Sequence, residues 1–387
     1  MTTPNVISVN RLPSLTWNRL GVNKAIINLD DLPKADREAL YSEFNTEQVK
    51  KETLPSPKAL AFSDSFSGGI RREAYIAAKR AIYQEQDFAT GLGKDFTDYI
   101  AELAPETDVY TVEENQKVEK PIILRWDFGS GAKAAAQQVI HAKKGSSATF
   151  IITEASELDA YGNGAYETKV ILEESAKIHL VKVHLLGSKF VLMDDTAALL
   201  GEKSEFDFTQ MALGGAKIYA GCYADQTGSK SKFNVDTGYM ADYDHLIDLN
   251  YIACQRGTKT ESKINVRGSL KDNAKKVFRG TTDFRKGSKG SVGEEQEDVL
   301  LLDPGAINKT VPVILTEEEE VAGHHGATVG NLSKEVLFYM GTRGIAKKEA
   351  EMLMTRGRLL SIANLIPDEK TVHRISAFVK ETFSTDE

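Results

Sequence analysis

The chain has 387 residues, with 48 lysine and arginine residues against 56 aspartate and glutamate residues and a net charge of -8. This length allows a sizeable core in two or three domains, and the acidic balance argues against broad binding to nucleic acids or anionic membranes. The first residues lack a basic segment followed by an apolar core, and no apolar run approaches the ~18 residues that span a bilayer. A cytoplasmic protein is therefore expected.

The N-terminal region, residues 1–104, is expected to mix helical and irregular segments. Apolar residues recur at approximate helical spacing in residues 36–49, which predicts a first helix there. A second amphipathic helix is expected between Ile70 and Ile82, where apolar residues form one stripe and charged residues lie opposite.

From about Asp108 to Leu315 the sequence changes to short apolar alternations separated by Gly, Ser, Asp, Asn and Lys. This texture predicts about twelve short strands with almost no helix between them. A loose echo of Ala or Ser, then Lys, then an apolar residue recurs at positions 176, 216, 231 and 262. Such an array fits an antiparallel sandwich as well as a β-solenoid in which coils stack on one another, and the residues alone leave both open.

Two cysteines, Cys222 and Cys254, are too few for a disulfide framework, a thiolate-only metal site or an iron–sulfur cluster held by this chain alone. Each is expected to be a buried apolar residue. No GxxxxGK(S/T) phosphate loop is present, so no nucleotide is expected on this chain.

Paired histidines, His324 and His325, stand in a glycine-rich stretch at 321–330 that is interpreted as a turn. Neutral imidazole is the commonest metal ligand, and the neighbouring glycines leave room for a ligand. The residues alone leave three interpretations open: a ligand for a metal, a structural histidine held by hydrogen bonds, and a self-contained mononuclear metal site that uses both rings.

Residues 331–387 predict three closing helices. Ser333 is a suitable N-cap for the first, and Pro367 fits the first turn of the last. The middle helix is expected to bury one face, formed by Ala350, Leu353, Met354, Gly357 and Leu360.

The stretch Asn308–Ile345 combines NKTVPVIL, an acidic turn, GHHGATVG and LFYMGTRGI. This combination resembles the SufB/SufD family of the SUF iron–sulfur cluster assembly machinery, and weaker similarity extends upstream to PSLTWNRLGVN. The resemblance implies a right-handed parallel β-helix core, here at 105–330, between an N-terminal region at 1–104 and a C-terminal helical domain at 331–387. It thereby favours the solenoid over the sandwich.

In this family, SufB and SufD subunits pair through their β-helix cores, and each binds the ABC-type ATPase SufC through its C-terminal helices. The resemblance thus implies a noncatalytic scaffold subunit that shares a transient iron–sulfur cluster or iron with a SufB-like partner; a homodimer is the alternative pairing. It implies that His325 of the HGAT motif is the interface ligand, with His324 beside it. The expected partner-binding residues in the C-terminal region are Leu337, Phe338, Tyr339, Arg343 and Gly344.

One position separates the two branches of the family. SufB-like members carry a cysteine four residues before the threonine of the T-x-P strand, whereas here Ala306 stands four residues before Thr310. The missing thiol favours the SufD branch. A SufB-like subunit and a β-solenoid enzyme acting on polysaccharide remain as alternatives; the enzyme would need charged residues clustered along a groove, and most such enzymes work outside the cell.

Overall fold

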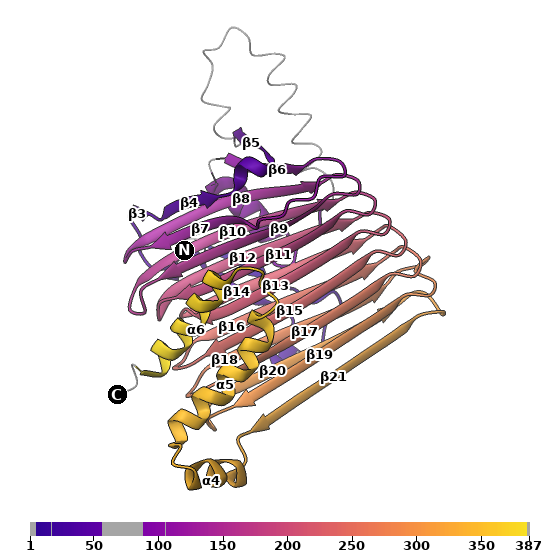
Figure 1. Ribbon diagram of the computed structural model, residues 1–387. Helices are drawn as coiled ribbons and strands as arrows, with labels where there is room; N and C mark the ends of the chain where they lie inside the picture. The colour runs from indigo at the N-terminus through magenta and orange to yellow at the C-terminus, as the bar shows by residue number, and fades with distance from the viewer. Residues whose placement is uncertain (1–4, 17, 56–87, 105, 385–387) are drawn as a thin grey trace.

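The structure is a computed structural model that describes residues 5–16, 18–55, 88–104 and 106–384. Figure 1 shows a tall stack of coils with the C-terminal helices lying along one face. The helix expected between Ile70 and Ile82 lies outside the described residues.

A parallel β-helix forms the body of the molecule. Consecutive strands alternate between two sheets, so that each coil contributes one strand to each sheet, and neighbours within a sheet are parallel throughout the coils. The coil strands of the first sheet are β6 (Glu106–Val112), β8 (Ala132–Ala142), β10 (Tyr161–Leu172), β12 (Lys189–Leu200), β14 (Lys217–Gln226), β16 (Leu246–Gln255), β18 (Lys275–Phe284) and β20 (Ile307–Thr316). Those of the second sheet are β7 (Ile122–Phe128), β9 (Ser147–Ser156), β11 (Lys177–Leu186), β13 (Glu205–Gly214), β15 (Lys232–Ala241), β17 (Glu261–Leu270), β19 (Val292–Leu301) and β21 (Ala322–Asn331). The expected mainly β solenoid is confirmed.

The length of a coil varies along the stack. Val191 pairs with Lys217, whereas Lys275 pairs with Ile307, so the chain takes between 26 and 32 residues to return to the same sheet. This variation explains why the sequence repeat looked irregular. Among the coil strands, β8, β10, β12 and β21 were not predicted. β10 and β12 are covered on both faces and so lack the alternation of a half-buried strand, whereas β21 contains the glycine-rich stretch that was interpreted as a turn.

Side chains at paired positions stack inside the coils. The rings of Phe206 and Phe233, one above the other on β13 and β15, have centroids 5.7 Å apart and planes within 9° of parallel. In a parallel sheet in register, equivalent positions of successive strands share a face, so each inward side chain covers its neighbour. The core therefore runs continuously along the stack.

The N-terminal region consists of short strands, the last two of which close the first coil. These are β1 (Val6–Val9), β2 (Ala25–Asn28), β3 (Arg37–Glu38), β4 (Leu40–Phe44) and β5 (Lys50–Pro55), with 3-10 turns η1 (Asn18–Leu20), η2 (Leu29–Asp31) and η3 (Thr46–Gln48) and one helix, α3 (Lys94–Leu103). β4 and β5 add antiparallel to β7 and β6, so the first coil has a paired edge.

The helix expected at residues 36–49 is wrong, because this stretch contains β3, β4, η3 and the turn into β5. Pairing with β7 decides the outcome: Tyr41 lies opposite Trp126, with ring centroids 4.6 Å apart. Cross-strand contacts of this kind override a weak helical spacing.

Three helices close the chain as predicted: α4 (Lys334–Thr342), α5 (Lys347–Ala363) and α6 (Glu369–Ser384). The Ser333 hydroxyl caps α4 by accepting from the backbone N–H of Val336. The predicted buried face of α5 is partly wrong, because Leu353 is 40% exposed while Leu359 and Ile362 are buried against the second sheet. Among the described residues, no helix is long and apolar enough to cross a membrane.

Candidate functional site

The paired histidines lie on the last strand of the solenoid, so the expected glycine-rich turn is wrong. β21 pairs with β19 on one side and ends the order of its sheet on the other. Every residue from Gly323 to Asn331 is exposed, whereas β17 two strands earlier is mostly buried. The last coil thus presents both an open strand edge and an uncovered inner face, at the lower end of the stack in Figure 1.

His324 and His325 point to opposite faces of the sheet. On β19, Val299 belongs to the interior core, so Glu295 and Glu297 share its inward side. The register pairs His325 with Glu295 and His324 with Glu294, which places His325 inward and His324 outward.

Two adjacent residues on opposite faces cannot hold one metal ion together. Within the described part of the chain, moreover, no group of three or more His, Cys, Asp or Glu side chains is arranged to hold a metal. The geometry thus disfavours a self-contained mononuclear site built on both histidines. Metal binding by His325 stays a prediction, and it would need further ligands from another molecule.

An acidic patch that sequence reasoning missed lies one coil beneath His325. Glu295 is 5% exposed and accepts a 2.8 Å hydrogen bond from the Thr282 hydroxyl, while its Oε2 has no hydrogen-bond partner among the described residues. Burial raises its pKa to about 7, although the Thr282 bond opposes the shift. The sequence contained a sign of this patch: Glu295 and Glu297 occupy alternating positions of a strand at which the preceding coil carries the apolar residues Ile264 and Val266.

Glu297 belongs to the same acidic patch, and the positive charge of a lysine balances its negative charge. It forms an ion pair with the buried Lys276 and accepts a 2.5 Å hydrogen bond from the Thr310 hydroxyl of the last coil. The interior therefore becomes acidic at the open end, where the preceding coil carries Ile264 and Val266 at the paired positions. A polar interior is what a coil end that meets water or another chain requires.

A hollow of about 200 Å³ lies against the last strands of the second sheet and is lined by both histidines. Its lining also includes Lys263, Glu294, Glu295 and Gln296, and Gly326 adds no side chain to fill it. His324 and His325 therefore border one hollow, although their side chains leave the strand on opposite faces.

Deep inside the middle coils, a second ionic cluster is sealed from solvent. Lys182 donates to Asp194 at 2.5 Å, and His184 lies 2.8 Å from Glu154 and 3.2 Å from Asp194, all with side chains 0% exposed. Burial alone would lower the pKa of His184, but the charges of Glu154 and Asp194 outweigh it and raise the pKa to about 9. His184 is thus a structural histidine held inside the core.

Both cysteines are buried, as predicted, and burial raises the pKa of each thiol. A buried thiol with a raised pKa is a poor source of the thiolate that iron requires. Cys222 and Cys254 are accordingly unsuited to serve as cluster ligands.

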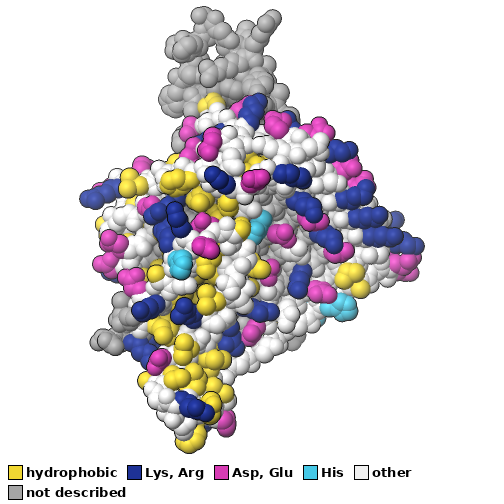
Figure 2. Space-filling view, viewed as in Figure 1, with side chains coloured by type: hydrophobic (Ala, Val, Ile, Leu, Met, Phe, Trp, Pro, Cys, Tyr) yellow, Lys and Arg dark blue, Asp and Glu magenta, His cyan; other side chains and the backbone are white. Residues whose placement is uncertain are grey.

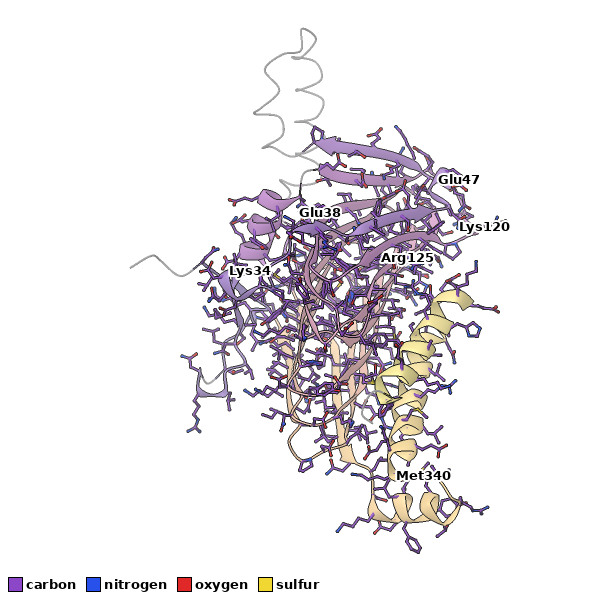
Figure 3. The ribbon with its side chains drawn as sticks, turned by 90° about the vertical axis from the view of Figure 1, so that its left-hand side faces the viewer. Lys34, Glu38, Glu47, Lys120, Arg125 and Met340 are labelled. Carbon is purple, nitrogen blue, oxygen red and sulfur yellow. The ribbon has the colours of Figure 1, made fainter. Side chains whose placement is uncertain are left out.

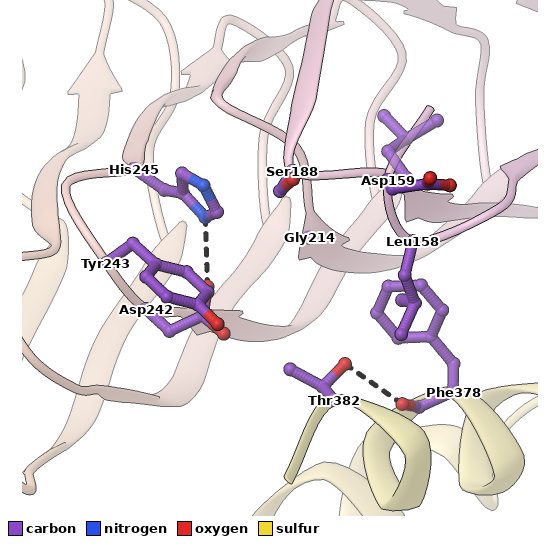
Figure 4. Close-up of a pocket in the computed structure, with 10 residues that line it drawn as sticks. Leu158, Asp159, Ser188, Gly214, Asp242, Tyr243, His245, Phe378 and Thr382 are labelled. Atoms are coloured by element: carbon purple, nitrogen blue, oxygen red, sulfur yellow. Dashed lines mark hydrogen bonds and ion pairs between the residues drawn. The ribbon is translucent and has the colours of Figure 1, made fainter. Parts of the chain in front are cut away.

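A pocket of about 210 Å³ lies between strand-connecting turns and α6 (Figure 4). His245 and Asp242 lie on one wall, with Nδ1 and Oδ1 2.9 Å apart, and Phe378 of α6 lies on the other. None of the residues predicted for the functional site lines this pocket.

The predicted partner-binding residues gather on and after α4, a helix that projects below the coils in Figure 1. Phe338 is 75% exposed and Tyr339 is 59% exposed, whereas Leu337 is half-buried. The guanidinium of Arg343 lies over the Tyr339 ring, 5.3 Å from its centroid, and Gly344 has a positive φ of 81° that ends the segment. Packing against the other described residues therefore leaves both aromatic rings largely exposed.

Comparison with known proteins adds to this geometry. A family model described as SUF system FeS cluster assembly, SufBD core domain, matches residues 128–358, which is more than half of the chain. The iron–sulfur cluster assembly protein SufD of Bacillus subtilis is 34% identical over 113 residues, 29% of this chain and 26% of that protein. The aligned part thus spans about a quarter of that relative's length.

Longer alignments have lower identity. An iron–sulfur cluster assembly SufBD family protein of Pyrococcus horikoshii is 24% identical over 368 residues, which cover 92% of this chain and 77% of that protein. A SufBD family protein of Staphylococcus saprophyticus is 21% identical over 324 residues, 78% of this chain and 68% of that protein. The similarity therefore extends well beyond the C-terminal motifs.

Proposed function

The chain belongs to the SufBD family of iron–sulfur cluster assembly proteins, and from this premise we propose that it is a SufD-like, noncatalytic scaffold subunit. The observation that carries the SufD-like role is the absence of a usable thiolate at the open end. Ala306 occupies the position where SufB-like members have cysteine, and both cysteines of the chain are buried in other coils. Sulfur would then be accepted by a partner subunit.

The open end of the β-helix is the proposed surface for a SufB-like partner. β21 leaves one edge without a strand partner among the described residues, and an exposed strand edge is a template for pairing with another chain. The half-buried Ile314 and the 49% exposed Val329 lie on the uncovered inner face of the last coil and supply apolar area. A partner coil would continue the stack and cover them.

His325 is the proposed contribution of this subunit to a shared iron or cluster site. It lies on the inner face at this interface, above Glu295, where imidazole from one chain can meet thiolates from the other. The transient iron–sulfur cluster is cargo in this proposal. Glu295 would favour a cationic iron beside His325.

The exposed segment around α4 is the proposed contact for a SufC-like ATPase. Its aromatic side chains and Arg343 are of the types enriched at protein interfaces. ATP-driven movement of this partner would reach the coils through α5, whose buried face packs on the second sheet.

A matched pair of variants tests the site in a complex co-purified without oxygen from cells that express the partners. His325→Ala should lower the iron and sulfide content per complex several-fold while the partners remain bound. His324→Ala, on the opposite face of the same strand, is the control and should behave as wild type.

Equal iron content in the His325→Ala and wild-type complexes would remove His325 from the proposed site. Loss of the partner instead would make His325 a structural interface residue. Purification of the chain as a homodimer, with no SufB-like or SufC-like companion, would contradict the scaffold role itself.

A further inference from the structure

A groove of about 490 Å³ lies at the opposite end of the β-helix from His325. Its floor is the outer face of β7 and β9, with Ile123 and Arg125. One wall is the end of β4, with Phe44, and the other is the first turns of α6, with Lys370 and Arg374. Figure 3 labels Arg125 on the side along which the C-terminal helices run.

Two arginines in this groove share one carboxylate unequally. Arg125 donates to Asp127 through Nε at 2.9 Å and Nη2 at 2.7 Å. Arg374 approaches the same carboxylate only to 3.8 Å and makes no hydrogen bond with any described residue, although its side chain is 34% exposed. No described residue accepts a hydrogen bond from the Arg374 guanidinium, and its partial exposure leaves these donors available to water or to a ligand.

The groove has an excess of positive charge. Burial, and then the neighbouring charge of Arg125, lower the pKa of Arg374, and Asp127 only partly opposes this effect. Lys370 is exposed on the same wall. Asp368 is the acid of the lining, and its Oδ2 accepts from the Thr371 backbone N–H at 2.8 Å and from the Thr371 hydroxyl at 2.7 Å.

The opposite wall is apolar and open. Phe44 is 51% exposed and Ile123 is half-buried beside it. Figure 2 shows lysine and arginine side chains next to a hydrophobic patch near the upper end of α6. A groove of this size, with one apolar wall and convergent charged groups, can hold a small molecule that is itself part apolar and part charged.

We propose that this groove binds a small organic phosphate. Arg374, Arg125 and Lys370 hold the phosphate, and Phe44 and Ile123 contact a flat apolar group of the same molecule. Guanidinium groups bind phosphate oxygens in pairs, and a dianion fits two neighbouring arginines better than a single carboxylate does. The proposal is independent of the assembly role, because it uses residues at the other end of the molecule.

Titration of the purified full chain with three probes tests this inference. Phenyl phosphate carries both groups, inorganic phosphate only the anion and phenol only the ring. Phenyl phosphate should bind at one site with a Kd of about 0.1 to 1 mM, inorganic phosphate should bind more weakly, and phenol should not bind measurably.

Variants locate the site and separate its two halves. Arg374→Gln should weaken phenyl phosphate binding at least tenfold, and because Arg374 makes no hydrogen bond with the described chain, thermal unfolding should be unchanged. Phe44→Ala should lower phenyl phosphate affinity to that of inorganic phosphate and leave the latter unaltered. Arg37→Gln, an arginine with a 77% exposed side chain outside the groove, is the control and should bind as wild type.

Wild-type affinity in a folded Arg374→Gln protein would overturn the proposal. So would equal binding of phenyl phosphate and inorganic phosphate by the wild-type chain, since the apolar wall would then have no role.

Discussion

Replacing Lys182 by methionine should destabilise the protein by about 3 kcal/mol. The side chain lies inside the β-helix with 0% exposure and donates to the Asp194 carboxylate at 2.5 Å and to the Asp195 carbonyl at 3.2 Å. Methionine fills a similar volume but leaves the Asp194 charge buried without its lysine. Removing one partner of a buried ion pair costs about 3–5 kcal/mol, and the nearby His184 places the expected loss at the lower end.

Urea unfolding monitored by circular dichroism measures the change in the free energy of unfolding. The dependence of this free energy on urea concentration should be the same in both proteins, so that a shift in midpoint reports stability. Lys177→Met is the matched control on the same strand: Lys177 pairs with Glu205 at 2.8 Å, but its side chain is 55% exposed, so the loss should stay below about 1 kcal/mol. Adding Asp194→Asn to Lys182→Met should recover part of the loss, because no unpaired carboxylate then remains. A Lys182→Met loss no larger than that of Lys177→Met would refute the reasoning.

Two further predictions concern the site. Glu295→Gln should stabilise the chain at neutral and higher pH by up to about 3 kcal/mol. The folded pKa of Glu295, about 7, exceeds its ordinary 4.5, so this carboxyl group contributes stability below pH 4.5 that is lost as the pH rises through 7. The free energies of unfolding of wild type and variant should therefore diverge between these pH values, and a constant difference would contradict the argument. Phe338→Ala should change the free energy of unfolding by less than about 0.5 kcal/mol, because the ring is 75% exposed, yet it should weaken binding of a SufC-like ATPase in a capture assay. Val6→Ala, which alters an exposed apolar residue far from α4, is the control and should bind the ATPase as wild type does. Equal binding by both variants would place the contact outside α4.

Local sequence patterns predicted the structure correctly in segments whose conformation depends mainly on neighbouring residues. Ser333 caps α4 as expected because a cap needs only its own side chain and the backbone three residues on. Most short apolar alternations became strands for the same reason. The helix at residues 36–49 was predicted wrongly because Tyr41 packs against Trp126, which is 85 positions away along the chain. The sequence of residues 36–49 alone contains no sign of that contact.

The candidate site was predicted only in part. The motif around His325 marked the right stretch, but its turn became a strand, because pairing with β19 extends the glycine-rich segment. Glu295 was missed because its role depends on being one coil below His325, and the coil length varies from 26 to 32 residues. Without a constant period, the residue that stacks beneath another cannot be identified by counting.

The sequence by itself determined the strand-rich texture of the core, the three closing helices, the shortage of thiols and the motifs of the SufBD family. The tertiary structure alone decided which residues stack and which face each one occupies. It separated His324 from His325, buried Lys182 beside Asp194, and left the last coil uncovered. The physical reason is that stacking between coils is a non-local contact, fixed by register across about 30 residues, whereas composition and capping act within a few residues.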